Sequence, residues 1–554
     1  MSRVAFTCLL LASAAGAAPD RAKEIDDYLT RCERFGFSGS VLVVRAGKTL
    51  LQRGYGLADR EKGVLASADT TYEIASATKT FTACAVMKLV EAGKLSLDDP
   101  IAKHLPGVPE ARGDITVRHL LAHTSGMPRS ATGGRGSNLR AAVAGYLAAP
   151  PVREPGAAFE YWNGGYALLA GIVEHVSGMS YMAFCRENLF RPAGLENTGF
   201  TGDDFLRNQA IGYDGAGAVR PAAGHPYGEY GWQYRGMGGI VTSVADLKRF
   251  LDAYEAGKVV SEGNRRLMET EVTEYYGLGW GIAATKRKTR RIGHGGDVRC
   301  FHTSIERFPD ERALVIVLTN VDAIEAWPIG WNVEALLFGE TPPYPVPPSL
   351  VDVDGKALDA LAGAYAIDDA NRIDVARSGG GLLVTGTGPR ASAALAGSEG
   401  ADLSREIAVA ERVVAAVRAR DPAPIAAVLA DRVPKSWPGH LVNIIWPGHL
   451  ERWGELKGVR TLGATAPSKG YVRVLVELEH ERGKTLLEVA FEQGKLGIFR
   501  LDAQRFLGGT VYQPTAPGRF AAFPWKGPQC PPLRFDGKDL VLAGGVRAAR
   551  IEAR

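Results

Sequence analysis

The sequence feature that most constrains the fold is a long apolar run that begins near Ser76 and stops at Gly93. Its residues from Cys84 to Val90 are apolar on most faces of a helix, and glycine is a usual C-terminal helix breaker. Such a helix must be buried, because water would otherwise meet apolar side chains on most sides. The sequence therefore predicts a buried helix that starts close to Ser76.

Ser76 and Lys79 form a Ser-x-x-Lys motif at the start of this helix. Residues three apart lie about 60° apart around a helix, so the Lys79 amine can reach the Ser76 oxygen. A serine hydroxyl is a weak nucleophile until a base takes its proton, and lysine is such a base only where burial or nearby charge lowers its pKa. The motif arises about once by chance in a chain of this length. Its meaning therefore depends on partners elsewhere in the sequence.

The first residues, 1–17, are typical of a secretory signal peptide. Arg3 supplies a positive charge, an apolar run follows from Val4 to Ala15, and small residues precede the expected cleavage site. The run is too short to span a membrane, and no later run is long and apolar enough to do so. We expect the mature protein to be periplasmic or secreted.

Charge and cysteine content exclude two other classes of protein. The net charge of +4 is spread along the chain without a Lys/Arg block, so nothing indicates binding to nucleic acid. The cysteines after the signal peptide are too scattered for a disulfide framework. We expect Cys84 and Cys185, which lie in helix-like apolar runs, to be buried thiols.

The predicted elements of residues 18–340 describe an α+β domain. Strand patterns occur near both of its ends, at 38–45, 49–55, 298–307 and 313–319. Helical patterns fill most of the sequence between them, which favours one sheet built from both ends with a helical region inserted. A Pro-rich stretch, residues 341–349, is a stiff linker that closes this domain.

The remainder of the chain changes character twice. Short strand pieces occupy residues 350–397 and 507–554, whereas residues 398–506 carry amphipathic helices followed by long alternating strands. We interpret this order as a small β-domain split in two by an inserted α+β module. Two consecutive small domains are the alternative.

Tyr161-Trp162-Asn163, in a loop just before a predicted helix, supplies the first partners of Ser76. A tyrosinate, or a tyrosine hydrogen-bonded to Lys79, could shuttle a proton between Ser76, the leaving group and the hydrolytic water. The Asn163 amide could orient Lys79 and a substrate carbonyl. Trp162 is expected to be a wall of the cleft.

His294-Gly295-Gly296-Asp297, between strand-like segments, supplies the second set. Its glycines let a strand backbone lie close against a substrate. A main-chain N–H in this segment, together with that of Ser76, would form an oxyanion hole.

The order and surroundings of these motifs, with Ile115 to Gly126 between the first and second, resemble the class C β-lactamase and penicillin-binding-protein-like serine hydrolases. The resemblance implies an antiparallel sheet flanked by helices, a helical subdomain, and a site in the cleft between them. It also implies acyl-enzyme chemistry, in which Ser76 attacks a carbonyl, Lys79 and Tyr161 move protons, and water releases the acyl group. No cofactor or metal is implied.

One departure from the family pattern bears on the substrate. The β-lactamases usually carry Lys-Thr-Gly in the third motif, where its cationic edge receives a substrate carboxylate, and this chain has His294-Gly295-Gly296 there. A neutral histidine followed by Asp297 is a poorer carboxylate receptor. The sequence therefore resembles the esterase, D-aminopeptidase and amidase branches. A true β-lactamase, a peptidoglycan-directed D-peptidase, or a penicillin-binding sensor without turnover are the alternatives.

His119 and His123 are four residues apart, as zinc ligands on a helix can be, but Leu120 occupies the place of the metalloprotease glutamate. We expect structural roles for both. Residues 398–506 resemble ketosteroid-isomerase-like cones, and the split β-domain resembles small barrels that follow the hydrolase in some relatives. The expected partners are a small-molecule or peptide substrate and, through the C-terminal domains, further copies of the chain.

Overall fold

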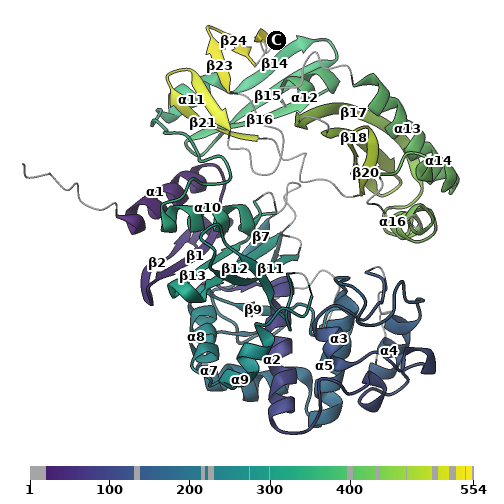
Figure 1. Ribbon diagram of the computed structural model, residues 1–554. Helices are drawn as coiled ribbons and strands as arrows, with labels where there is room; N and C mark the ends of the chain where they lie inside the picture. Colours follow the sequence, from purple (N-terminus) through teal and green to yellow (C-terminus); the bar gives the residue numbers. More distant parts are fainter. Residues whose placement is uncertain are drawn as a thin grey trace, which may run out of the picture.

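The structure is a computed structural model that describes residues 20–129, 131, 138–213, 219–221, 230–273, 275–298, 300–322, 324–395, 403–430, 433, 437–468, 471–501, 510–522, 532–542 and 545–551. The predicted signal peptide lies outside the described residues. Figure 1 shows the N-terminal part, up to residue 340, in the lower half of the view and the C-terminal part above it.

A six-stranded antiparallel sheet organises the N-terminal part, with the strand order β10-β11-β12-β13-β1-β2. The sheet is built from both ends of this part, because β1 (Gly39–Arg45) pairs with β13 (Ala313–Thr319) and Gly39 lies opposite Thr319. The predicted α+β class and the inserted helical region are both confirmed.

Both faces of this sheet are covered, which explains why β1 and β13 are almost continuously apolar. Val41 and Val43 face α1 (Arg21–Arg34) and α10 (Ala326–Phe338) on one side. Leu42 points to the opposite side, into a larger core shared with the inserted helices. Successive side chains of a strand alternate between faces, so each residue of β1 serves one core or the other.

Helix α2 (Thr78–Glu91) runs through that larger core, against α5 (Asn163–Ser177) (Figure 1). Every residue from Thr78 to Met87 is buried, as the apolar sequence predicts. A single turn of 3₁₀-helix, Ala75–Ala77, precedes it, so Ser76 lies just before the regular helix.

The other helices and strands of the N-terminal part are β2 (Lys48–Tyr55), β3 (Leu57–Asp59), β4 (Val64–Leu65), β5 (Tyr72–Glu73), α3 (Val117–Leu121), α4 (Leu139–Leu147), α6 (Tyr181–Cys185), α7 (Arg191–Ala193), β6 (Gly199–Phe200), β7 (Ile211–Tyr213), β8 (Val219–Pro221), β9 (Ile240–Thr242), α8 (Val244–Glu255), α9 (Glu262–Met268), β10 (Gly281–Ala284), β11 (Arg290–Val298) and β12 (Phe301–Phe308).

The C-terminal part contains a closed barrel whose strands come from two separate stretches of sequence. They are β14 (Gly363–Asp368), β15 (Asn371–Ser378), β16 (Gly381–Thr387), β21 (Thr510–Ala516), β22 (Arg519–Ala522), β23 (Leu533–Asp536), β24 (Asp539–Val541) and β25 (Arg547–Arg550). Strand β16 pairs directly with β21 across the intervening sequence. Helices α11 (Gly355–Leu361) and α12 (Pro389–Leu395) accompany the barrel.

The intervening sequence forms a four-stranded antiparallel sheet packed on helices, with its own hydrophobic core. Its elements are α13 (Ser404–Ala419), α14 (Ala423–Ala426), α15 (Trp437–His440), α16 (Trp446–Trp453), β17 (Leu456–Ser468), β18 (Tyr471–His480), β19 (Gly483–Glu492) and β20 (Lys495–Arg500). Helices followed by a hairpin sheet are the predicted pattern, and a barrel-like domain split by an α+β insertion is the predicted fold class.

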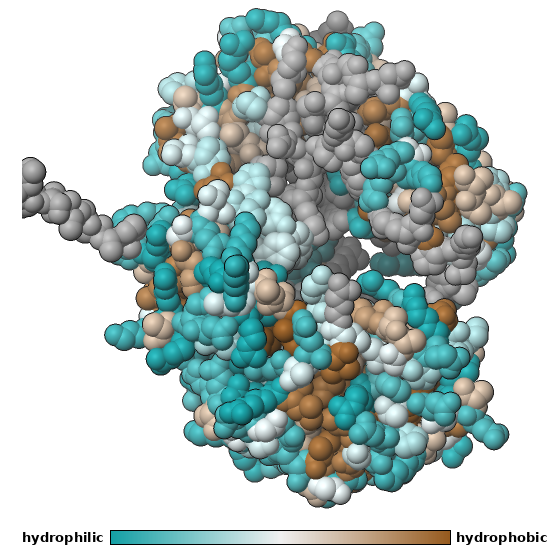
Figure 2. Space-filling view, in the orientation of Figure 1, coloured by the Kyte–Doolittle hydropathy of each residue, from teal (hydrophilic) through white to brown (hydrophobic). Residues whose placement is uncertain are grey.

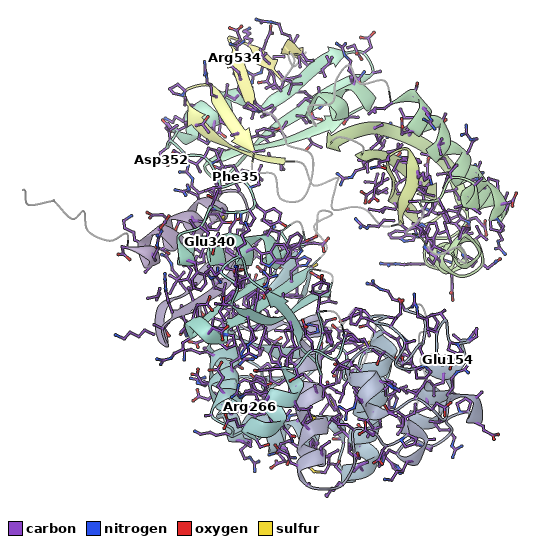
Figure 3. The ribbon with its side chains drawn as sticks, viewed as in Figure 1. Phe35, Glu154, Arg266, Glu340, Asp352 and Arg534 are labelled. Carbon is purple, nitrogen blue, oxygen red and sulfur yellow. The ribbon has the colours of Figure 1, made fainter. Side chains whose placement is uncertain are left out.

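The end of α1 meets the segment that leads to the barrel. Arg34 donates a hydrogen bond to the Val351 carbonyl and forms an ion pair with Asp352 at 3.3 Å. Figure 3 shows Phe35 and Asp352 close together at this junction. Earlier in the same segment, the ring of Tyr344 packs on Trp327 and Trp331 of α10. The predicted linker therefore lies against the N-terminal part.

The described cysteines Cys32, Cys84, Cys185 and Cys300 are buried free thiols, which confirms the prediction for Cys84 and Cys185. Within the described residues, no single helix has the length and apolar composition to cross a membrane. Helix α5 and residues 181–193 together reach that length and composition, but the two helices are bent by 80° relative to each other. Figure 2 shows a mainly hydrophilic face, with hydrophobic residues gathered on its lower half.

Candidate active site

Ser76 is the one residue between Thr70 and Met87 that is not buried. The residue before it, Ala75, has a left-handed backbone with φ of +45°, although it is not glycine and is almost fully buried. Residues held in this region cost free energy and are often found at functional sites. The turn of the backbone at Ala75 thus precedes Ser76, which is partly exposed while its neighbours in the sequence are buried.

Lys79 is fully buried, and its Nζ lies 3.0 Å from Ser76 Oγ. The same nitrogen donates a hydrogen bond to the Met237 carbonyl at 2.9 Å. Among the described residues, no carboxylate lies within ion-pair distance of Lys79. Burial therefore lowers the pKa of Lys79 well below its ordinary value of 10.5.

Tyr161 stands beside this pair, with its ring centroid 5.1 Å from Lys79 Nζ. Burial raises the pKa of Tyr161 to about 12, although a hydrogen bond with Ser76 acts in the opposite direction. Its hydroxyl is therefore protonated at neutral pH. The structure brings together Ser76, Lys79 and Tyr161 from segments separated by more than 80 residues.

His123 supports Tyr161 from behind, with the two ring centroids 4.3 Å apart. Its Nδ1 accepts a hydrogen bond from the Trp162 main-chain N–H at 3.2 Å, and burial lowers its pKa well below the ordinary value. This contact with the site was not predicted, although His123-Thr124-Ser125-Gly126 belongs to the run that carried the family resemblance. The histidine is neutral and positions the tyrosine segment.

His119 has a different task. Its Nδ1 accepts a hydrogen bond from the Thr116 main-chain N–H, and the Thr116 side chain accepts one from the His119 main chain, which forms a capping box at the start of α3. Both histidines are thus structural, as predicted. Within the described residues, no cluster of three or more His, Cys, Asp and Glu side chains is arranged to hold a metal ion.

Trp162 and Asn163 differ from their predicted places. Trp162 is buried in the core and its indole donates to the Ala131 carbonyl, so it is not a wall of the cleft. Asn163 is exposed at the first position of α5, whereas the Lys79 amine contacts Ser76 and the Met237 carbonyl. The Asn163 amide does not hold Lys79 in this structure.

The third motif lies on β11, and Gly296 brings that strand against the nucleophile. A side-chain Cβ at Gly296 would lie 2.1 Å from the Ile74 carbonyl oxygen and 3.0 Å from the Ser76 nitrogen. Only glycine permits this approach of two backbones. The backbone of β11 at Gly296 therefore lies directly against the backbone of Ser76.

His294 is buried and turned toward Tyr276. Its Nδ1 donates to the Gly295 carbonyl at 2.6 Å, so its Nε2 accepts from the Tyr276 hydroxyl at 3.1 Å. Burial, helped by the charge of Lys79, lowers the pKa of His294 to about 4. The imidazole is therefore neutral at physiological pH, and this position offers no cation to a substrate.

Asp297 ends the motif with an exposed side chain that contacts His302 Nδ1 at 2.7 Å. Burial acts to lower the pKa of His302, but the hydrogen bond and charge of Asp297 outweigh it and raise that pKa above its ordinary value. The Asp297 carboxylate thus contacts His302 of β12 and favours the charged form of its imidazole.

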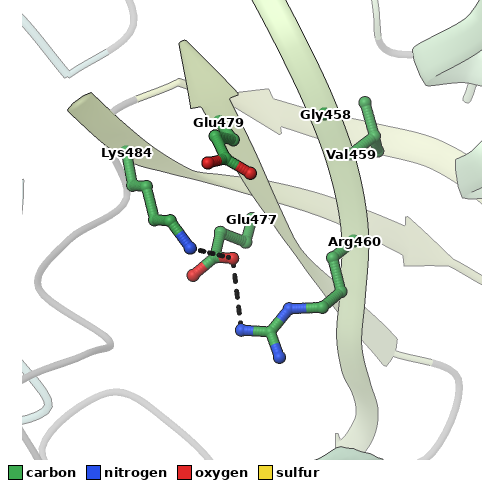
Figure 4. Close-up of a pocket in the computed structure, with 6 residues that line it drawn as sticks. All are labelled: Gly458, Val459, Arg460, Glu477, Glu479 and Lys484. Atoms are coloured by element: carbon green, nitrogen blue, oxygen red, sulfur yellow. Dashed lines mark hydrogen bonds and ion pairs between the residues drawn. The ribbon is translucent and has the colours of Figure 1, made fainter. Parts of the chain in front are cut away.

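A pocket of about 490 Å³ lies next to these residues and is lined by Phe159, Tyr161, Tyr275, Tyr276, Gly281, Ile282, Ala283, Arg291, Gly293, His294, Gly295 and Glu306. A second pocket of about 370 Å³ lies on the four-stranded sheet (Figure 4). There the carboxylate of Glu477 pairs with both Arg460 and Lys484 at 3.1 Å, so these charged side chains are already paired with one another. Of these two pockets, the first is the one lined by residues of the candidate site, namely Tyr161, His294 and Gly295.

Comparisons with known proteins agree with this geometry. Residues 24–335 match the family model described as Beta-lactamase. The chain is 28% identical over 389 residues to penicillin-binding protein 4* of Bacillus subtilis (strain 168), covering 63% of this chain and 83% of that protein. It is 30% identical over 304 residues to protein flp of Staphylococcus aureus (strain MW2), covering 51% of this chain and 59% of flp.

Among solved structures, the octameric penicillin-binding protein homologue from Pyrococcus abyssi superposes with a TM-score of 0.51 at 22% identity, over 86% of this chain and 99% of that one. FmtA from Staphylococcus aureus superposes with a TM-score of 0.50 at 23% identity, over 59% and 90%. These two likenesses establish the fold. Since the family model spans more than half of the chain and its three motifs meet at one site, the protein belongs to the Beta-lactamase family of penicillin-binding-protein-like serine hydrolases.

Proposed function

We propose that the protein is an exported serine hydrolase that cleaves an amide or ester bond through an acyl-enzyme on Ser76. The observation that carries this proposal is the buried Lys79 amine, which lies 3.0 Å from Ser76 Oγ with no carboxylate paired to it among the described residues. Such surroundings favour the neutral form of the lysine amine, which is able to accept the serine proton.

Acylation proceeds by attack of Ser76 Oγ on the substrate carbonyl carbon while the hydroxyl proton passes to Lys79 Nζ. The main-chain N–H groups of Ser76 and Asp297 stabilise the oxyanion. The tetrahedral intermediate then breaks its bond to the leaving group, which receives the proton from Lys79 through the Tyr161 hydroxyl. In deacylation, water attacks the acyl carbon while it loses a proton to Lys79. The bond from that carbon to Ser76 Oγ then breaks, and Ser76 recovers a proton.

The pKa directions favour Lys79 over Tyr161 as the base. Burial lowers the pKa of the amine and raises that of the phenol to about 12, so at neutral pH the amine is the group with a free lone pair. Tyr161 then acts as a neutral proton relay, and a tyrosinate is not required.

The third motif favours esters and aminoacyl amides over β-lactams. A β-lactam carries a carboxylate, and the side chain at the expected receptor position is the neutral His294. The second candidate, a penicillin-recognising hydrolase or D-peptidase, is favoured by the name of the Bacillus subtilis relative, penicillin-binding protein 4*.

The test is to incubate the purified protein with a fluorescent penicillin, a panel of p-nitrophenyl esters and D-aminoacyl anilides. We expect turnover of esters or anilides, and the Ser76→Ala variant should lose at least about 10³-fold in kcat/KM. The control Ser177→Ala, at the end of α5, should retain activity. A penicillin burst without turnover would support a sensor, and hydrolysis undiminished in Ser76→Ala would exclude the mechanism.

We further propose that residues 1–17 direct export and that the C-terminal part mediates self-association; the Pyrococcus abyssi homologue with the same fold is octameric. Fractionation of cells expressing the chain with and without residues 1–17 tests the first proposal. Light scattering of the full chain, compared with a variant lacking residues 341–554, tests the second. A monomeric full chain would contradict it.

A further inference from the structure

The pocket beside Ser76 continues past the catalytic residues along one edge of the sheet. Strand β10 pairs with β11 only as far as Gly281 opposite Gly293. Among the described residues, no strand pairs with β11 beyond that point on this side. The pocket therefore runs from Tyr161 past His294 and Gly295, which β10 does not pair, and then over the paired residues Gly281 and Gly293 to Glu306 on strand β12.

Two glycines make Glu306 accessible from this edge. Gly281, Gly293 and Glu306 lie side by side across β10, β11 and β12. A Cβ at Gly293 would lie 2.5 Å from Glu306 Oε2, so the carboxyl occupies the space that a side chain on β11 would fill. The Glu306 side chain remains 16% exposed. Its carboxyl is thus a polar group at the end of a passage lined by glycine.

In the described part of the chain, Glu306 forms a single, long ion pair. Its nearest cationic group is Arg291 Nε at 3.7 Å, and Arg291 also faces Glu334 at 3.5 Å and lies over the Trp331 ring. The next guanidinium, Arg287, pairs with Glu311, Glu334 and Glu340. Four carboxyl groups thus share two guanidinium groups in this network, of which only Glu306 and Arg291 line the pocket.

This carboxyl is costly to ionise without a further cation. Burial raises the pKa of Glu306 to about 7; Arg291 and a hydrogen bond with Trp331 lower it, and the neighbouring Glu334 raises it. A cation bound next to Glu306 would favour the ionised form and gain a charge-assisted contact. The opposite wall of the pocket is aromatic, formed by Phe159, Tyr161, Tyr275 and Tyr276.

The position of Glu306 determines how far the cationic group of such a ligand lies from the bond that is cleaved. Gly296 lies against the Ser76 backbone, and Gly293 is three residues away on the same strand. At about 3.3 Å per residue, Gly293 is roughly 10 Å from the catalytic end. The group that Glu306 contacts is therefore well separated from the bond that Ser76 attacks.

We propose that Glu306 is a specificity-determining residue that binds a cationic group, such as a primary ammonium, carried by the substrate about 10 Å from the scissile carbonyl. This inference rests on the proposed function and names its substrate class: amides or esters with a remote positive charge. The polarity is the reverse of that expected for a β-lactamase, because a carboxylate at this end meets Glu306.

The test uses matched esters that differ only in the terminal group of a linear chain of that length: ammonium, methyl or carboxylate. One series carries the chain in the acyl part and a second carries it in the alcohol part, since either side of the ester can lie toward Glu306. We expect kcat/KM in one series to favour ammonium over methyl by about tenfold or more, and to disfavour carboxylate.

Two variants of opposite effect identify the residue. Glu306→Gln should bring the ammonium-to-methyl ratio close to one, and Arg291→Gln, which removes the competing cation, should raise it. Glu340→Gln, from the same charged network but outside the pocket lining, is the control and should leave the ratio unchanged. Melting temperatures establish that each variant is folded.

The outcomes separate this inference from the function on which it rests. Hydrolysis that depends on Ser76 but shows no preference for ammonium in either series overturns the role of Glu306 and leaves the hydrolase intact. A preference that survives Glu306→Gln does the same. No Ser76-dependent hydrolysis of any ester, with no labelling by penicillin, overturns both.

Discussion

Two buried basic side chains, Lys79 on α2 and Arg307 on β12, differ in whether carboxylates pair with them. Lys79 is fully buried and Arg307 is 2% exposed. Arg307 forms ion pairs with Glu269 at 2.7 Å and Glu255 at 3.0 Å, and it lies over the rings of Tyr254 and Trp280. Lys79 contacts a hydroxyl and a carbonyl, and Tyr161 faces it.

The two environments have opposite consequences for protonation. Burial acts to lower the pKa of Arg307, yet its two carboxylate partners raise it above the ordinary value. For Lys79, burial among the described residues is the one influence on the pKa, and it lowers that pKa. A paired cation holds a structure together, whereas an unpaired amine is destabilising and chemically available. The difference identifies Arg307 as structural and Lys79 as the candidate base.

The largest expected effect is on catalysis at Lys79. Lys79→Met should lower kcat/KM by about 10²- to 10⁴-fold, because the proton acceptor for Ser76 is lost. The control is Lys88→Met, which removes a partly exposed lysine of the same helix that is paired with Glu91. Ester hydrolysis is the measurement. Near-normal rates in Lys79→Met would exclude Lys79 as the base and leave Tyr161 as the remaining candidate.

The next effect is on stability at Arg307. Arg307→Met should lower the free energy of unfolding by about 3 kcal/mol, because it removes the 2.7 Å partner of the buried Glu269 and leaves only Arg265 at 3.4 Å. The folded fraction should keep its activity. Urea unfolding measures the loss, and adding Glu269→Gln should recover part of it. A stable but inactive variant would contradict the division between the two sites.

Removal of Lys79 should also stabilise the fold, by about 1 kcal/mol at neutral pH. Between the lowered pKa of Lys79 and its ordinary value of 10.5, the unfolded chain binds one more proton than the folded chain. Stability of the wild type therefore rises with pH through that window, and the advantage of Lys79→Met shrinks as pH approaches 10.5. Denaturant midpoints measured from pH 7 to 10 test this sign; a constant difference would indicate that Lys79 is charged when buried.

The smallest effect concerns an ion pair at the surface. Arg266 and Glu262 pair on α9, but both side chains are more than 60% exposed. Arg266→Ala should change the free energy of unfolding by no more than about 0.5 kcal/mol, because water and salt screen the pair. Thermal unfolding at low and high salt is the measurement. A loss comparable with that of Arg307→Met would show that burial is not what separates the two arginines.

Local patterns explain which elements were predictable. The buried α2, the hairpin of β1 and β2 and the pairing of both ends follow from apolar periodicity, and the structure confirms them. Strand β17 (Leu456–Ser468) was missed because its glycines, threonines and proline interrupt the alternation. A predicted strand at 298–307 begins too early, since β11 ends at Val298 and β12 starts at Phe301.

The residues of the candidate site also divide into those that local sequence patterns predict and those that they do not. Ser76 and Lys79 share a helix turn, so their spacing alone predicts contact. The predicted contact of Asn163 with Lys79 is absent, and the contacts of His123, the Met237 carbonyl and Glu306 were not anticipated. These depend on loops and strands whose meeting no local pattern encodes.

The sequence by itself determined the candidate nucleophile, the spacing of its lysine and the order of the three motifs, because short-range helix geometry and residue chemistry are sufficient for these. Only the tertiary structure decided that no carboxylate of the described residues pairs with Lys79, that His294 is neutral and that a carboxyl lies at the far end of the pocket. The physical reason is that a pKa depends on desolvation and on charges brought close by distant segments.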